Sequence, residues 1–218
     1  MLLTLSAVQM RAQEYDSPEY ISLGREKART KVVPYPTAEE AQRLGAGMVE
    51  SKFVRPIKEW TRTEEEDAVV FSSKYVIPFV WLSRMAILYV DEASGAYEVI
   101  INGKKVGYSA NAFTPAEFNV TKASKENVNT ISIRVLKDHF SRKMECFNEN
   151  TEPRIGEVFV MSQPMIRVRD ILHKTNVDMK SEYANVELGL VVKTETLNPK
   201  KARIHYELLA PDTTVVTY

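Results

Sequence analysis

The sequence predicts an all-β protein built around an antiparallel β-sandwich. From residue 52 onward, apolar side chains recur at every second position in short runs, and Gly, Asn, Asp or Pro separates the runs. Beyond one short helix, no amphipathic segment is available as the crossover that parallel strands need. Two antiparallel sheets bury each other's apolar faces without helices. Periodicity alone leaves jelly-roll and immunoglobulin-like topologies both open.

The composition is that of a folded protein with no bias toward anionic partners. Hydrophobic residues make up 44% of the 218 positions and charged residues 27%, which excludes disorder as the overall state. Lys and Arg together number 29, as do Asp and Glu, so the formal net charge is zero. Such a chain has no global field that attracts phosphate backbones or acidic membranes. A nucleic-acid partner is therefore not expected.

The first twelve residues, MLLTLSAVQMRA, resemble the apolar core and cleavage site of a secretory signal peptide, with Ala12 at the last cleaved position. The basic start of a signal peptide is missing. Two interpretations stay open: a truncated signal peptide over 1–12, or an ordinary N-terminal strand. The first predicts a periplasmic or extracellular protein. In either case the run is too short to span a bilayer.

Residues 13–37 mix Pro, Tyr and charge without a clear period, which predicts an extended N-terminal arm that packs across another part of the molecule. Thr37 then opens the segment TAEEAQRLGAGM. Glu40 lies three residues after Thr37, which is the spacing of a capping box, and Gly45 and Gly47 provide the stop. We expect one short helix there.

Alternating strands follow the helix. An Asn-Gly pair at Asn102 and Gly103 predicts a tight hairpin turn. The acidic run 64–67 and the pair Lys104-Lys105 are interpreted as solvated turns rather than docking patches. The predicted strands lie at residues 68–71, 74–78, 85–90, 97–102, 117–120, 130–135 and 157–161.

Pro164 marks a predicted domain boundary. A new set of alternating strands follows it, at residues 166–171, 173–177, 187–192 and 203–209. The fifty-odd residues after Pro164 are too few for an independent sandwich, which needs about 100. We therefore expect an incomplete second domain and a longer natural protein.

No catalytic constellation is recognisable within the chain. Acidic pairs that could cleave a glycosidic bond, at residues 64–67 and at Glu145, Glu149 and Glu152, fall in polar segments where surface acids are normal. His139, His173 and His205 lack zinc-ligand spacing, and there is no Gly-rich phosphate loop or G-x-S-x-G elbow. The lone Cys146 is interpreted as structural. Several aromatic side chains could pack in the core or against a sugar ring: Trp60, Trp81, Tyr108, Phe113 and Phe140.

Residues 96–135 carry a recognisable order of motifs. The run AYEVIINGKKVGYSANAFTPAEFNVTKASKENVNTISIRV resembles the sugar-binding jelly-roll domain that begins glycoside hydrolase family 2 enzymes, particularly β-galactosidases. The matching elements are ING followed by VGYS, then PAEFNVT, then EN and the strand that ends at Val135. Residues 25–29 with 33–36 resemble the N-terminal arm of these enzymes, and residues 165–175 resemble the passage into their first immunoglobulin-like domain.

The resemblance implies a galactose-binding-domain-like jelly roll over residues 38–163 and a partial immunoglobulin-like domain over 164–218. It also implies that the chain is the non-catalytic N-terminal part of an exported hydrolase of O-glycosidic bonds, most similar to β-galactosidases. The two catalytic glutamates of that family lie in a downstream (β/α)₈ barrel, so no catalytic residue is assigned here. The implied partners are a β-galactoside and that barrel, within the same chain.

The resemblance points to one substrate-binding residue, Asp138. In β-galactosidases an Asp shortly after the matching strand reaches toward the galactose and a nearby sodium ion. A turn aspartate that caps its own backbone remains the alternative. No metal ligand or cofactor is assigned to these residues, although the resemblance allows sodium or magnesium in the parent enzyme.

A second hypothesis from another functional class also remains open. The family's usual segments are shortened or altered around residues 54–72 and 145–158. These departures favour a non-catalytic β-sandwich module that binds glycans or another protein at a cell surface.

Overall fold

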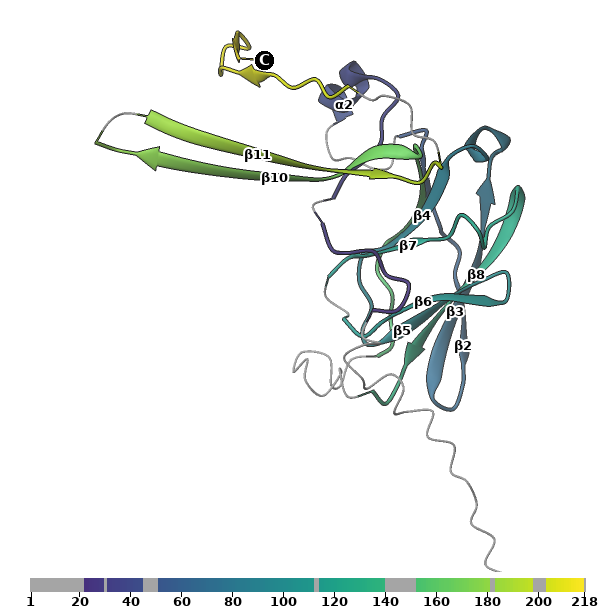
Figure 1. The fold of residues 1–218 in the computed structure, drawn as a ribbon. Helices are drawn as coiled ribbons and strands as arrows, with labels where there is room; N and C mark the ends of the chain where they lie inside the picture. The colour runs from purple at the N-terminus through teal and green to yellow at the C-terminus, as the bar shows by residue number, and fades with distance from the viewer. Residues whose placement is uncertain are drawn as a thin grey trace, which may run out of the picture.

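Two antiparallel sheets face each other, and a long two-stranded ribbon projects away from them (Figure 1). The computed structural model describes residues 22–29, 31–44, 51–111, 114–139, 152–180, 183–197 and 203–217. The sheets have four strands in the order β1-β9-β4-β7 and five strands in the order β2-β3-β8-β5-β6. The antiparallel β-sandwich predicted from the sequence is confirmed.

The chain alternates between the two sheets from β3 to β9, apart from the hairpin β5–β6, which gives the sandwich jelly-roll connectivity. The four-stranded sheet contains β1 (Val54–Pro56), β4 (Met85–Val90), β7 (Ala116–Asn119) and β9 (Val158–Gln163). The five-stranded sheet contains β2 (Thr61–Glu64), β3 (Ala68–Ile77), β5 (Tyr97–Ile101), β6 (Lys104–Ser109) and β8 (Asn127–Leu136).

The four-stranded sheet is buried on both of its faces. Its inner face packs against the five-stranded sheet around a large apolar cluster that includes Leu88, Phe118 and Ile133. A second cluster on alternate positions of the same strands, such as Ile87 and Phe159, is covered in part by Val33 of the N-terminal arm. This double cover explains why every residue of β4 and β9 is buried.

The Asn102–Gly103 turn forms as predicted, between β5 and β6. Both residues have positive φ, 49° and 78°, which is the conformation that a two-residue type I′ turn requires. The Asn102 side chain also donates to the Ala123 carbonyl (2.9 Å) and to Asn129 Oδ1 (2.8 Å). The turn is therefore fixed to the connection that leads into β8, which ties together two motifs that are separate in the sequence.

Helix α2 (Ala38–Leu44) confirms the predicted helix. Thr37 Oγ1 accepts a hydrogen bond from the Glu40 amide at 3.2 Å, as an N-cap residue does. The predicted stop at Gly45 and Gly47 lies outside the described residues. No helix in the described part of the chain is long and apolar enough to cross a membrane.

Two pairs of predicted strands are in fact single strands. Residues 68–71 and 74–78 form one strand, β3, because the polar pair between them is satisfied within the sheet: Ser72 Oγ lies 3.0 Å from Ser132 Oγ, and Ser73 Oγ donates to the Lys58 carbonyl at 2.7 Å. Residues 166–171 and 173–177 likewise form one strand, β10 (Ile166–Asp178). The breaks predicted at Ser72-Ser73 and at Leu172 were therefore wrong.

Two further predictions are corrected at the edges of the fold. Glu64, predicted to lie in a solvated turn, belongs to β2, and only 65–67 form the turn into β3. The predicted strand 203–209 is reduced to β12 (Leu208–Leu209), which pairs with β13 (Val215–Thr217). Residues 203–207 have no ladder partner in the described part of the chain, so alternation there does not produce a strand.

The ribbon consists of β10 and β11 (Tyr183–Thr194), paired along their whole length. It leaves the sandwich directly after β9 and points away from it, with solvent on both sides over most of its length (Figure 1). Only the first residues of β10 are buried, where the ribbon meets the sandwich.

Candidate functional site

Asp138 lies immediately after β8, in the bend that leaves the five-stranded sheet, and it is exposed. The next residue, His139, turns inward: its Nε2 lies 2.9 Å from the hydroxyl of buried Tyr108. The anchored histidine therefore fixes the backbone beside Asp138. Among the described residues, no group of three or more His, Cys, Asp and Glu could hold a metal ion. Contact between Asp138 and a sugar or an ion stays a prediction.

Three acids of the run before β3, Glu64, Glu65 and Asp67, form ion pairs. Glu64 lies 2.7 Å from Lys137 Nζ, and the hydrogen bond from Lys137 holds the pKa of this carboxyl below its ordinary value. Arg134 pairs with both Glu65 and Asp67, and its hydrogen bond lowers the pKa of Asp67. Glu64, Glu65 and Asp67 are therefore all paired with basic side chains. The other candidate acids, Glu145 and Glu149, lie outside the described residues, as does Cys146.

The aromatic residues considered for a sugar platform are mostly in the core. Trp81 and Tyr108 are buried, and Trp60 is half-buried with its Nε1 donating to the Ile57 carbonyl at 3.2 Å. Phe113 and Phe140 lie outside the described residues. Trp81 and Tyr108 are therefore not available to a pyranose, and Trp60 packs against the core.

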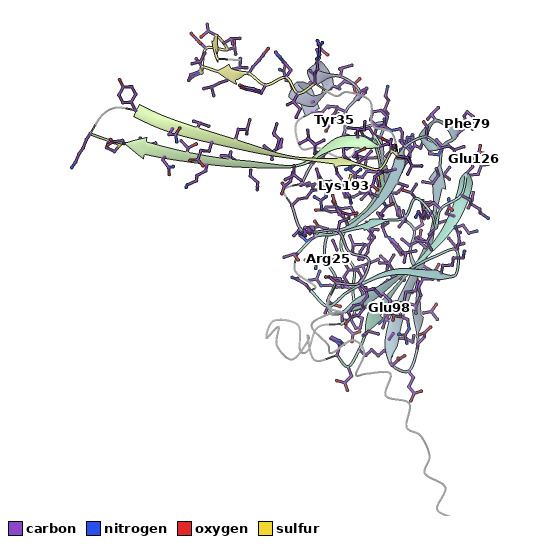
Figure 2. The ribbon with its side chains drawn as sticks, viewed as in Figure 1. Arg25, Tyr35, Phe79, Glu98, Glu126 and Lys193 are labelled. Carbon is purple, nitrogen blue, oxygen red and sulfur yellow. The ribbon has the colours of Figure 1, made fainter. Side chains whose placement is uncertain are left out.

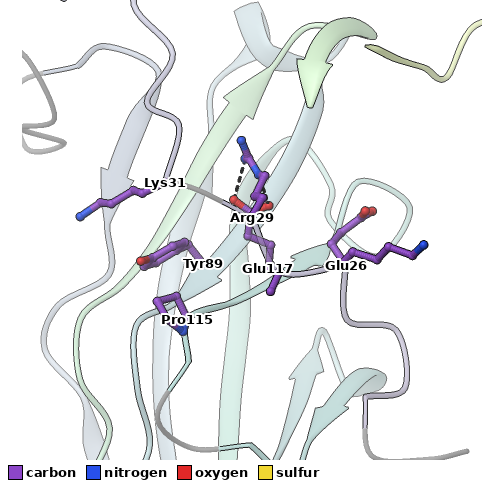
Figure 3. A pocket seen from close by; sticks show the side chains of 8 residues that line it. Glu26, Arg29, Lys31, Tyr89, Pro115 and Glu117 are labelled. Atoms are coloured by element: carbon purple, nitrogen blue, oxygen red, sulfur yellow. Dashed lines mark hydrogen bonds and ion pairs between the residues drawn. The ribbon is translucent and has the colours of Figure 1, made fainter. Parts of the chain in front are cut away.

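A buried ion pair joins the N-terminal arm to the sandwich. Arg29 of the arm donates from Nε and Nη2 to the two carboxylate oxygens of Glu117 in β7, at 2.9 and 2.6 Å (Figure 3). Their side chains are only 3% and 11% exposed. A bidentate pair at this depth fixes orientation as well as distance. The arm is therefore held on β7 in one register.

The same ion pair extends to the ribbon. Arg169 of β10 lies 3.8 Å from both Glu117 and Glu26, and Lys193 of β11 lies 3.0 Å from Glu26. Arg29 also donates to the Arg169 carbonyl at 3.2 Å. We call these five residues, Glu26, Arg29, Glu117, Arg169 and Lys193, the ion junction. It connects three segments that are far apart in the sequence.

Next to the ion junction, Arg167 is buried although one of its N–H groups lacks a hydrogen-bond partner in the described structure. Its side chain is 5% exposed, and the N–H group concerned is that of Nε. One amino group contacts the sulfur of Met85 at 2.8 Å, and the other lies 3.8 Å from Glu195. Burial lowers the pKa of Arg167, because removal from water disfavours the charged form.

Arg25, the residue before Glu26, also anchors the arm. Its guanidinium donates to Ser109 Oγ (3.2 Å), Thr114 Oγ1 (2.7 Å) and the Pro115 carbonyl (3.2 Å). Its backbone pairs with Phe118, so the arm adds an isolated bridge beside β7. In Figure 2, Arg25 lies below Lys193, on the side of the sandwich from which the ribbon projects.

A small cavity of about 60 Å³ lies between the arm and β7, lined by residues that include Glu26, Lys31 and Tyr89. Sites for small molecules usually enclose about 300–1,000 Å³, so this cavity is too small for a sugar ring. The ion junction therefore has a structural role, because it fixes how the arm, the sandwich and the ribbon meet. The sequence prediction missed it, since nothing in one sequence pairs Arg29 with an acid 88 positions later.

Comparison with known proteins decides the family. Residues 23–151 match the model for "Glycosyl hydrolases family 2, sugar binding domain". The chain belongs to glycosyl hydrolase family 2. The resemblance noted in residues 96–135 is thereby confirmed, and the matched stretch includes the arm from residue 23 onward, most of the sandwich and Asp138.

Relatives in this family are similar to the chain but much longer. A β-galactosidase of Priestia megaterium is 28% identical over 195 residues, which cover 85% of this chain and 16% of that protein. A β-galactosidase of Clostridium acetobutylicum is 33% identical over 104 residues, which cover 46% of this chain and 12% of that protein. The chain thus spans less than a fifth of these relatives.

Solved structures show the same fold. A β-glucuronidase of an uncultured Clostridium species superposes with a TM-score of 0.51 at 18% identity, covering 69% of this chain and 27% of that one. Bifidobacterium dentium β-glucuronidase, complexed with coumarin-3-O-glucuronide, gives 0.52 at 16% identity, covering 70% and 30%. At these identities the likeness concerns the fold alone.

Proposed function

We propose that this chain is the non-catalytic N-terminal part of an exported family 2 glycoside hydrolase of β-galactosidase type. The observation that carries the proposal is the match to a β-galactosidase over 85% of this chain but only 16% of that relative. In this proposal the catalytic (β/α)₈ barrel lies downstream, and retaining hydrolysis of a β-galactoside takes place there. The 218 residues alone are inactive.

The ion junction suggests how this part supports the rest of the enzyme. Because Glu26 and Glu117 bind basic side chains of β10 and β11, the direction in which the chain leaves the sandwich is fixed. We infer that residues 164–218 begin an immunoglobulin-like domain whose remaining strands cover the ribbon. The sandwich, arm and second domain would then form a rigid support for the barrel.

The gene beyond Tyr218 tests the enzyme hypothesis. A downstream (β/α)₈ barrel with two glutamates at strand ends, and β-galactosidase activity of the natural protein, would support it. A stop codon or a further series of sandwiches would contradict it. That second outcome favours the alternative, a module for glycan or protein binding at a cell surface.

Binding at Asp138 is a separate question that calorimetry answers. Galactose titrated into the 218-residue chain should bind with a dissociation constant of roughly 1 mM if this portion contributes a wall of the sugar site. Asp138→Asn should abolish the heat. Asp212→Asn, which changes another exposed turn aspartate, should leave it unchanged. If the unmodified chain gives no heat, this part has only a supporting role.

Export is tested on the natural gene product. Cleavage after Ala12 predicts a secreted protein whose first residue is Gln13. Mass spectrometry of the mature protein from the periplasm or medium reads this directly. Retention of residues 1–12 in the mature protein would contradict the signal peptide.

A further inference from the structure

A shallow groove lies on the outer face of the five-stranded sheet, beside the first residue of β2. There the connection from β1 to β2 passes along the edge of β3, and Ser73 Oγ donates to the Lys58 carbonyl at 2.7 Å. The groove encloses about 480 Å³, which is within the range of small-molecule sites. Residues that line it include Lys58, Glu59, Ser72, Lys74, Thr130 and Ser132.

The strand register explains why hydroxyl groups gather here. Thr61 pairs with Ser72, and Ser72 pairs with Ser132, so their side chains stand in a row across three strands on one face. Lys74 pairs with Thr130 in the next row. A row of hydroxyls followed by a lysine gives donors and acceptors spaced along a flat surface, which suits a ligand with several hydroxyl groups.

The two lysines of the groove differ from the other basic residues of this face. Arg134 pairs with Glu65, and Lys105 lies 2.8 Å from Glu98. By contrast, neither Lys58 nor Lys74 forms an ion pair with any described residue. With two ammonium groups against the single carboxylate of Glu59, the groove has a net positive charge, which favours a ligand that carries a negative charge.

Two further features point to a sugar rather than a bare anion. The row beyond Lys74 and Thr130 is the exposed pair Val76 and Val128, at 47% and 49%, an apolar surface for the C–H face of a pyranose. Glu59 on the rim has φ 58°, a backbone conformation that costs a non-glycine residue about 1–3 kcal/mol and often marks functional positions. Its carboxylate can accept hydrogen bonds from sugar hydroxyls.

We propose that this groove binds an acidic saccharide, with a uronate carboxylate at Lys58 and Lys74 and ring hydroxyls at Ser72, Thr130 and Ser132. An inorganic phosphate would use the lysines but neither the hydroxyl row nor the valine pair. This inference goes beyond the proposed function, because it involves neither Asp138 nor a downstream barrel.

Titration of the isotope-labelled 218-residue chain, followed by NMR amide shifts, tests the groove. Trigalacturonate should shift the amides of residues 72–74 and 130–132. Lys74→Gln should weaken binding about fivefold, as expected for one screened surface charge pair, and Lys74→Arg should restore it. Lys122→Gln, an exposed lysine outside the groove, is the matched control and should leave the affinity within about twofold.

Three outcomes would overturn the proposal. The first is that trigalacturonate causes no shifts, or causes shifts that centre outside the groove and are unchanged by Lys74→Gln. The second is that a neutral galactotriose binds as tightly as trigalacturonate, which would remove the role of the lysines. The third is that inorganic phosphate competes at equal concentration, which would make the groove a simple anion site. Asp138→Asn should not affect these titrations, so failure here is distinguishable from failure of the β-galactosidase proposal.

Discussion

The sandwich and the ribbon use the same alternating pattern but differ in what covers them. In β4, both sets of alternate side chains are buried, because the five-stranded sheet lies on one face and the arm on the other. In the ribbon, Ile171, Val177, Val186 and Leu188 share one face yet are 48–62% exposed. An alternating sequence therefore predicts that one face of a strand is apolar. Whether that face is buried depends on a second layer of structure that packs against it.

This difference has an energetic consequence. Burial of an aliphatic side chain contributes about 1.5–3 kcal/mol, whereas a ribbon with solvent on both sides gains mainly ladder hydrogen bonds and cross-strand contacts. The sandwich should thus carry the stability of the chain, and the ribbon should depend on the ion junction and on whatever packs against it. The following substitutions are matched between the two regions.

The largest effect on the free energy of unfolding is expected from truncation of an isoleucine in the core. Ile133→Ala in β8 removes a fully buried side chain from the main cluster and should lower the free energy of unfolding by about 2–5 kcal/mol. Ile171→Ala in the exposed ribbon should lower it by less than about 1 kcal/mol. Urea unfolding followed by fluorescence of Trp60 and Trp81, both within the sandwich, measures the difference. Equal losses would mean that the ribbon is packed in solution.

The ion junction should give the next largest effect. Glu117→Gln leaves Arg29 and Arg169 in a buried site without their shared carboxylate, so we expect a loss of about 3 kcal/mol. Glu187→Gln, on the exposed ribbon, should change the free energy of unfolding by less than about 0.5 kcal/mol. The same urea titration compares the two variants. If Glu117→Gln is as mild as Glu187→Gln, the junction does not hold the arm in solution.

Two glycines, one in the sandwich and one in the ribbon, allow the same comparison with a smaller expected effect. A Cβ at Gly107 would lie 2.2 Å from the Phe118 ring and 3.2 Å from the Leu23 carbonyl, so Gly107→Ala should cost about 1–3 kcal/mol through forced displacement of ring and arm. A Cβ at Gly189 would meet Leu172 at 3.5 Å, an ordinary contact. Gly189→Ala should therefore be neutral or stabilise by up to about 1 kcal/mol. Thermal unfolding of both variants tests this, and a loss at Gly189 equal to that at Gly107 would refute the contrast.

Local chemistry made much of the fold predictable. The Asn102–Gly103 turn and the cap at Thr37 follow from backbone preferences of the residues themselves, and both form as expected. The predicted strand limits were wrong where a partner segment determines the structure. Ser72 and Ser73 look like a break until their hydrogen bonds to Ser132 and to the Lys58 carbonyl are known. The extended segment 203–207 failed for the opposite reason, because alternation without a partner does not make a strand.

The candidate site was less predictable than the fold. Asp138 came from a family resemblance, and its neighbour His139 showed no sign in the sequence of the hydrogen bond to Tyr108 that fixes the bend. The ion junction joins Arg29, Glu117 and Arg169, and contacts between charges so far apart in the sequence depend on how the arm and the ribbon meet β7. A single sequence has no local signal for such a contact. The order of motifs in residues 96–135 was the most specific pointer to the correct family.

The smallest expected effect concerns the pH dependence of the sandwich. The hydrogen bond from Arg134 lowers the pKa of Asp67, so this carboxylate stabilises the fold above its ordinary pKa of 3.8. That contribution is lost as pH falls through the lower folded-state value. Because Asp67 is largely exposed, Asp67→Asn should cost less than about 1 kcal/mol at pH 7 and nothing at the acid end. Asp212→Asn, in the turn between β12 and β13, should leave the curve of the sandwich unchanged. Tryptophan fluorescence at fixed urea between pH 7 and 3 measures both, and parallel curves for Asp67→Asn and the unmodified chain would show that the Arg134 pair does not stabilise the sandwich.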